Sequence, residues 1–86
     1  MDNVFFGNDR FELMVDTRGY RPEELKCTVG PNTIEITAQK QEVSAGAQRI
    51  LETARSYQLP QLVVPQQAVC CLSSEGLLLI VVPWQK

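Results

Sequence analysis

The amino-acid sequence predicts an all-β fold, a sandwich of seven or eight short strands in two layers. Several segments alternate apolar and polar residues with the period of two that half-buried strands show. Turn-forming residues recur about every 8–12 residues, as in small sandwiches. The aliphatic run Leu77–Val82, flanked by Gly76 and Pro83, favours a strand covered on both faces. A chain of 86 residues can cover both faces only with two layers.

The first part of the chain predicts two strands and a connection. Val4–Phe6 is a short apolar segment that the turn residues Gly7–Asp9 separate from the next element. Phe11–Asp16 alternates, with its odd-numbered apolar residues on one face, as in a half-buried strand. The connection that follows contains Pro22, which lacks a backbone N–H, and we expect Glu23–Glu24 to form one short turn.

The middle of the chain predicts a hairpin and a long ambiguous segment. Leu25–Val29 and Thr33–Ala38 both alternate, and Gly30–Asn32 between them is a strong turn signal. Val43–Gln48 consists of small and polar residues and predicts a flexible loop. Arg49–Leu59 contains helix formers but does not follow a helical stripe. One strand face would carry Leu51, Thr53, Arg55, Tyr57 and Leu59.

The last part of the chain is predicted to form a loop between Pro60 and Pro65 and then a final hairpin. The hairpin comprises a short strand at Val69–Leu72, a tight turn at Ser73–Gly76 and the strand Leu77–Val82, which Pro83 is expected to end.

Composition indicates one globular domain and argues against two classes of partner. The 86 residues are 44% hydrophobic and 21% charged, as in a folded rather than a disordered chain. The net charge is −2 and the eight Lys and Arg are scattered, which argues against a nucleic-acid partner. The aliphatic run is far shorter than the roughly 20 residues that cross a bilayer, so no membrane partner is expected.

The number and spacing of the cysteines indicate the cellular compartment. The chain has three cysteines, Cys27, Cys70 and Cys71, and the adjacent two would point to opposite faces of a strand. This odd number does not make a secreted disulfide framework, so we expect a reducing cytoplasm. Residues 1–10 carry charges and lack the apolar segment of a secretory signal peptide.

The residues that most catalytic and metal sites need are missing or dispersed. The chain has no histidine, which removes imidazole-based catalysis and zinc sites that use imidazole. Glu23 and Glu24 fall in a turn, where we expect them to be solvated, and the five glycines occur singly. We therefore expect no enzyme activity, no cofactor and no metal. Function is expected at sheet edges, where other strands can pair.

Several segments together form a recognisable pattern. The most specific are a Pro-Glu-Glu-Leu turn at 22–25, an Arg-x-Tyr-x-Leu-Pro segment at 55–60 and a Leu-Ser-Ser-Glu-Gly-Leu-Leu turn at 72–78. Weaker matches at Asn8–Phe11, Val15–Asp16 and Ile34–Ile36 fall in the same order. Over about residues 8–83 the chain resembles the α-crystallin domain of animal small heat-shock proteins.

This resemblance implies a fold and a function. The implied fold is an immunoglobulin-like antiparallel β-sandwich in one domain, residues 1–86, without the family's N-terminal arm and C-terminal tail. The implied function is that of an ATP-independent holdase of the stress response, which binds partly unfolded client proteins and prevents their aggregation. The implied partners are these clients and, in a homodimer or hetero-oligomer, related small heat-shock proteins in the cytoplasm or nucleus.

The resemblance also implies an interface on the strand before the Leu-Pro segment, where two subunits pair antiparallel. The residues that match this interface are Arg49, Leu51, Thr53, Arg55 and Tyr57. Arg55 matches the family's interface arginine; the alternative is a solvated charge on an edge strand. Thr53 and Ala54 are smaller than the residues usual there in the family, so we expect a weaker dimer.

A groove between two strands is implied as well, which in the family receives an Ile-x-Ile or Ile-x-Val peptide. Its walls would be Leu25, Cys27 and Val29 on one side and Ala68, Cys70 and Leu72 on the other. Small apolar side chains there leave pockets for branched ones, although any one of the six could instead point into the core. Cys27 and Cys70 would face each other, and we hypothesise that they form a redox pair.

A function of another class remains open. The short, uncharged segment Val43–Gln48 and the thinned interface suit a specialised adaptor or co-chaperone sandwich that binds one dedicated folded partner. General suppression of client aggregation distinguishes the chaperone from the adaptor.

Overall fold

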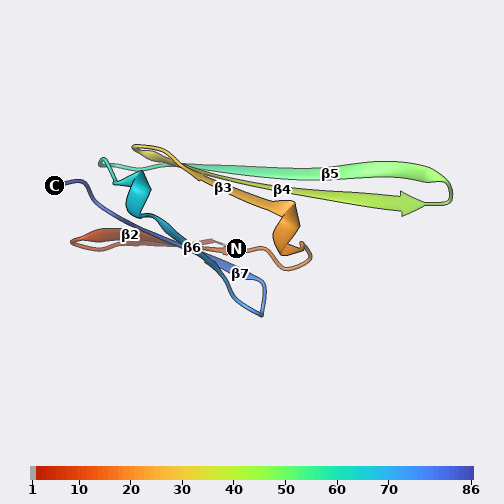
Figure 1. The fold of residues 1–86 in the computed structure, drawn as a ribbon, viewed down its shortest axis with the longest axis horizontal. Coiled ribbons are helices and arrows are strands. Elements are labelled where there is room, and N and C mark those ends of the chain that lie inside the picture. Colours follow the sequence, from red (N-terminus) through yellow and green to blue (C-terminus); the bar gives the residue numbers. More distant parts are fainter. Residues whose placement is uncertain (1) are drawn as a thin grey trace.

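The computed structural model describes residues 2–86, which form seven strands and two short 3-10 turns. The elements are β1 (Asp2–Phe6), β2 (Arg10–Asp16), η1 (Pro22–Glu24), β3 (Leu25–Val29), β4 (Thr33–Ser44), β5 (Ala47–Gln58), η2 (Pro65–Gln67), β6 (Val69–Leu72) and β7 (Leu77–Pro83). The strands pair antiparallel in two sheets, ordered β1-β2-β7-β6 and β3-β4-β5. Figure 1 shows the sheets as two layers, which confirms the predicted all-β sandwich.

The core lies between the inward faces of the alternating strands. It includes Phe11, Leu13 and Val15 of β2, Ile34 and Ile36 of β4, and Leu78, Ile80 and Val82 of β7. The outward residues of β7, Leu77, Leu79 and Val81, are only half-buried. The prediction that this strand is covered on both faces is therefore wrong. β7 lies between β2 and β6, and within residues 2–86 no third layer covers the outer face of their sheet.

The hairpin of β4 and β5 is longer than the sequence predicts. Val43–Gln48, expected to be a loop, continues both strands, and only Ala45 and Gly46 form the turn. Their φ angles are +52° and +79°, as a two-residue type I′ turn requires. The loop prediction is wrong because small polar residues also suit an exposed β-ribbon. This ribbon extends past the sandwich and gives the molecule its 54 Å long axis (Figure 1).

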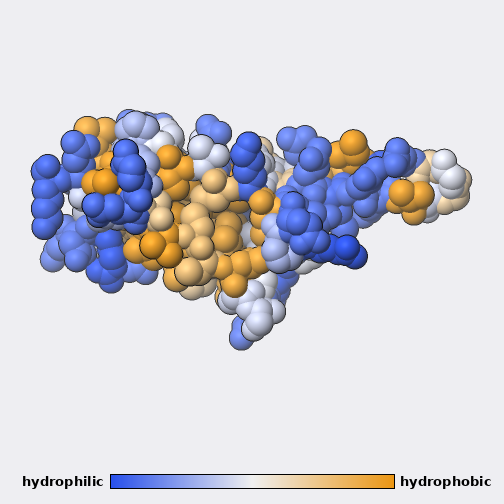
Figure 2. Space-filling model, in the orientation of Figure 1, coloured by the Kyte–Doolittle hydropathy of each residue, from blue (hydrophilic) through white to orange (hydrophobic). Residues whose placement is uncertain are grey.

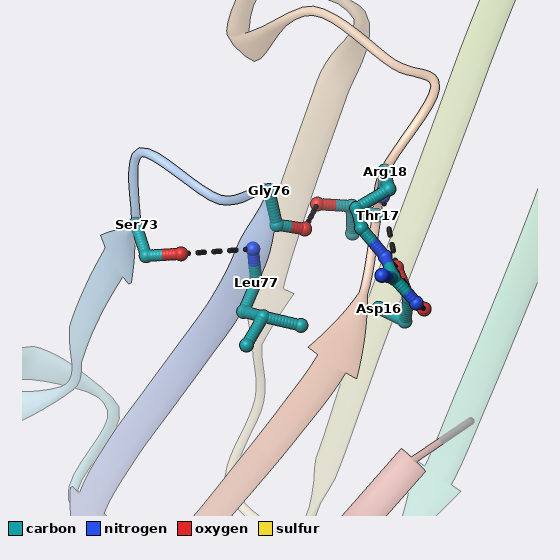
Figure 3. Close-up of polar contacts among 6 residues, drawn as sticks. All are labelled: Asp16, Thr17, Arg18, Ser73, Gly76 and Leu77. Carbon is teal, nitrogen blue, oxygen red and sulfur yellow. Dashed lines mark hydrogen bonds and ion pairs between the residues drawn. The ribbon is translucent and has the colours of Figure 1, made fainter.

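The turn between β6 and β7 is held against the end of β2 by a small polar corner (Figure 3). The Thr17 backbone N–H and hydroxyl both donate to the Gly76 carbonyl, at 2.9 and 2.7 Å. The Ser73 hydroxyl accepts a hydrogen bond from the Leu77 N–H at 3.0 Å. Gly76 has a φ of +87°, and a Cβ there would lie 2.8 Å from Cγ of Arg18. The Leu-Ser-Ser-Glu-Gly-Leu-Leu segment is thus a structural corner.

Beyond β7 the chain stays attached to the sandwich. Pro83 is expected to end the last strand, but it is itself the final residue of β7. It ends only the run of aliphatic residues. Trp84 pairs with Val63 in an isolated bridge and donates its indole N–H to the Gly7 carbonyl at 2.8 Å. In the part of the chain that the structure describes, no helix is long and apolar enough to cross a membrane.

Candidate binding groove and edge strand

The strands β3 and β6 form the two sides of an open groove. Each lies at the edge of its own sheet, and no ladder pairs one with the other. Leu25, Cys27, Cys70 and Leu72 line a depression of about 250 Å³ together with Pro22 and Leu78. Figure 2 shows apolar surface gathered over this region, between the two 3-10 turns.

The remaining two predicted wall residues lie further along the same segments. Val29 of β3 and Ala68, just before β6, are half-buried and pack against the core. Cys27 and Leu72 also pack partly against the core. Four of the six predicted wall residues therefore line the depression, whereas Val29 and Ala68 lie beyond it at the rim of the core.

Alternation along β3 explains the groove. Lys26 and Thr28 are exposed, whereas Leu25, Cys27 and Val29 are half-buried because the inward face of an edge strand is covered on one side only. An extended segment of another chain could pair with such an edge and place alternate side chains in the depression. Sequence reasoning missed Pro22 and Leu78 as lining residues. Two signals could have found them: Pro22 begins the short turn that leads into β3, and Leu78 alternates onto the inward face of β7.

The two groove cysteines touch. The thiol of Cys70 donates to Sγ of Cys27 across 3.4 Å. Burial, together with this contact, raises the pKa of Cys27 to about 12. Cys70 is exposed. Cys71 is also exposed, and it pairs with outward-facing Leu79 rather than with the core. Across residues 2–86 no group of three or more cysteine or carboxylate side chains is placed to hold a metal ion.

The predicted interface residues all lie on β5. This strand is the edge of the three-stranded sheet, and nothing among residues 2–86 pairs with its free side. The five are Arg49, Leu51, Thr53, Arg55 and Tyr57, of which Leu51 and Tyr57 are half-buried and the others exposed. A long unpaired edge is a ready site for pairing with a second strand.

Three of these side chains also have partners within the chain. The Thr53 hydroxyl lies at hydrogen-bond distance, 3.1 Å, from the Tyr20 hydroxyl. Nη1 of Arg55 lies 2.7 Å from Oδ2 of Asp2, and the Tyr57 hydroxyl donates to the same oxygen. Burial alone would raise the pKa of Asp2, but the hydrogen bonds from Tyr57 and Arg55 outweigh it and lower the pKa. Burial and the Asp2 carboxylate raise the pKa of Tyr57. Sequence reasoning missed Asp2, because no local pattern links β1 to β5.

Comparisons with known proteins identify relatives over nearly the whole chain. The model of the Hsp20/alpha crystallin family matches residues 4–86. The alpha-crystallin B chain of Squalus acanthias is 33% identical over 76 residues, and heat shock protein 27 of Drosophila melanogaster is 31% identical over 78. These matches cover 87% and 90% of this chain but only 43% and 37% of the relatives. The chain thus spans less than half the length of either relative.

A solved structure agrees with the sequence matches. The rat alpha crystallin domain superposes with a TM-score of 0.81 at 28% identity, over 100% of this chain and 91% of that one. The sandwich of seven strands is therefore the fold of that domain.

Proposed function

Because the chain belongs to the Hsp20/alpha crystallin family, a family of non-enzymatic chaperones, we propose that it is the core domain of an ATP-independent holdase. It binds partly unfolded proteins and prevents their aggregation. The observation that carries this proposal is the apolar groove between β3 and β6, open along two unpaired strand edges.

The groove suits an extended apolar segment. Its half-buried side chains leave a depression, and its strand edges offer backbone hydrogen bonds that do not depend on sequence. A segment of the Ile-x-Ile type places two branched side chains on one face, two residues apart, as the alternation of β3 requires. Both an exposed stretch of a client and a flanking segment of a related chain have this form.

We further propose that two copies pair antiparallel through β5. The support is the unpaired edge of a 12-residue strand that carries all five predicted interface residues. The dimer is the building block of larger oligomers with related chains.

An aggregation assay tests the holdase proposal. Light scattering of a heat-denatured model enzyme, without ATP, should fall when the chain is present at a substoichiometric ratio. Leu25→Glu places a charge in the groove wall and should abolish most of the protection. Thr28→Glu adds the same charge to the exposed face of the same strand and serves as the matched control. Equal protection by both variants would exclude the groove as the client site.

A dedicated adaptor is the second candidate. The observation that favours it is the pairing of Arg55 with Asp2 inside one chain, which occupies a residue expected at the subunit interface. An adaptor would bind one folded partner tightly and leave client aggregation unchanged even in excess.

A further inference from the structure

Cys27 and Cys70 approach each other from opposite sheets at the middle of the groove. We propose that this dithiol is a modification site, at which a reversible disulfide joins β3 to β6. Its sulfur atoms lie 3.4 Å apart in the reduced form. A disulfide bond is about 2.05 Å long, so closure needs an approach of roughly 1.4 Å. No ladder ties the two edges together, which leaves them free to make this movement.

The two thiols differ in reactivity. Cys70 is exposed and is the sulfur that a solution oxidant reaches first. Cys27 is half-buried, and burial raises its pKa to about 12, which makes it the less reactive of the two thiols toward a solution oxidant. Cys70 is therefore the attacked sulfur and Cys27 the resolving one.

The reaction balances with oxidised glutathione as the oxidant. The Cys70 thiolate attacks one sulfur of oxidised glutathione, forms a mixed disulfide and releases one glutathione thiolate, which takes up a proton. Cys27 then loses its proton to solvent, its thiolate attacks Sγ of Cys70, and the second glutathione leaves as a thiolate that takes up a proton. Two cysteine thiols are oxidised to one disulfide, and one oxidised glutathione is reduced to two glutathione molecules.

Cys71 provides an internal control. It is adjacent to Cys70 and also exposed, but it lies on the outer face of its sheet. Exposure alone therefore predicts oxidation of Cys70 and Cys71 alike, whereas the geometry predicts a bridge between Cys27 and Cys70 only.

The bridge has a functional consequence, which rests on the proposed function. Cys27 and Cys70 line the depression from opposite walls, beside Leu25 and Leu72, so a bond between their sulfur atoms draws the two walls together at that point. An extended peptide would then lose room to run between the walls, and oxidation would close the groove.

Redox titration tests the modification site. The chain is equilibrated in glutathione buffers of increasing oxidised fraction, acid-quenched, alkylated and analysed by peptide mass mapping. We expect a Cys27–Cys70 linkage in the wild type and in Cys71→Ser, and none in Cys27→Ser or Cys70→Ser. The bridged protein should also melt roughly 5 °C or more above its reduced form, because the bridge constrains the unfolded chain. A linkage through Cys71, or only linkages between chains, would overturn the proposal.

A peptide titration separates this inference from the proposed function. Binding of a fluorescent Ile-x-Ile peptide to Cys71→Ser should fall at least roughly tenfold on oxidation and return on reduction. Equal binding in both states would overturn closure of the groove. Absence of binding in both states would overturn the proposed groove function, while a mapped bridge would still support the modification site.

Discussion

Asp2 is the residue that joins the first strand to the edge strand of the other sheet. One oxygen of its carboxylate accepts hydrogen bonds from Arg55 and Tyr57, and the other oxygen is buried with no hydrogen-bond partner among residues 2–86. These hydrogen bonds hold the pKa of Asp2 below 3.8. A lowered pKa in the folded state means that the carboxylate stabilises the fold above pH 3.8. This stabilisation is lost as the pH falls through the folded pKa.

Removing this charge should therefore lower stability in a pH-dependent way. We expect Asp2→Asn to unfold at a lower urea concentration than the wild type at pH 7, with the difference shrinking below pH 3.8 as Asp2 becomes protonated. Asp9→Asn, at an exposed turn position, should change the midpoint much less. A difference that persists unchanged at pH 3 would show that the charge of Asp2 is not the cause.

Among the single elements, the turn of the β4–β5 hairpin holds a non-glycine residue in an unfavourable backbone conformation. Ala45 adopts a φ of +52°, a left-handed conformation that costs an ordinary L-residue roughly 1–2 kcal/mol. Asn tolerates this conformation better, and Asn-Gly is the preferred pair for a type I′ turn.

Ala45→Asn should stabilise the hairpin by roughly 1 kcal/mol. Hydrogen exchange of the amides near the tip, at residues 41–44 and 47–50, should slow by roughly fivefold. The control is Ala47→Asn, which places the same side chain at an exposed strand position beside the turn. Unchanged exchange in Ala45→Asn would mean that the turn does not limit opening of the hairpin.

The strands could be predicted where alternation was clear and not where it was absent. β2 and β3 follow from alternating residues, and their bounds agree with the sequence to within one residue. The extension of β4 and β5 could not be predicted, because Val43–Gln48 has the composition of a loop and only pairing across the ribbon makes it a strand.

The groove was partly predictable for the same reason. Leu25, Cys27 and Val29 share a face by alternation alone, and the family resemblance supplied the opposite wall. The contact between Cys27 and Cys70 spans 43 residues, and the hydrogen bond from Arg55 to Asp2 spans 53, so only the folded chain reveals them.

For the whole molecule, the free edge of β5 predicts self-association. Light scattering across a dilution series should give the mass of a dimer at high concentration, and Arg55→Gly should raise the dissociation constant of the dimer at least roughly tenfold.

Two control variants belong to this experiment. Lys26→Gly makes the same kind of substitution on the opposite edge of that sheet and should leave the mass unchanged. Asp2→Asn removes the negative charge that pairs with Arg55 without altering β5, which separates an interface role of Arg55 from its ion pair within the chain. If Arg55→Gly stays dimeric like the wild type, the interface lies elsewhere.

The proposed binding of extended apolar segments in the β3–β6 groove can be observed residue by residue. The measurement is a titration with an Ile-x-Ile peptide followed by amide chemical shifts, with an Asp-x-Asp peptide as the control. We expect the largest changes at Leu25–Val29 and Val69–Leu72, and none of comparable size with the control peptide. Changes confined to β5 or to the outward face of β7, or no changes at all, would contradict the claim.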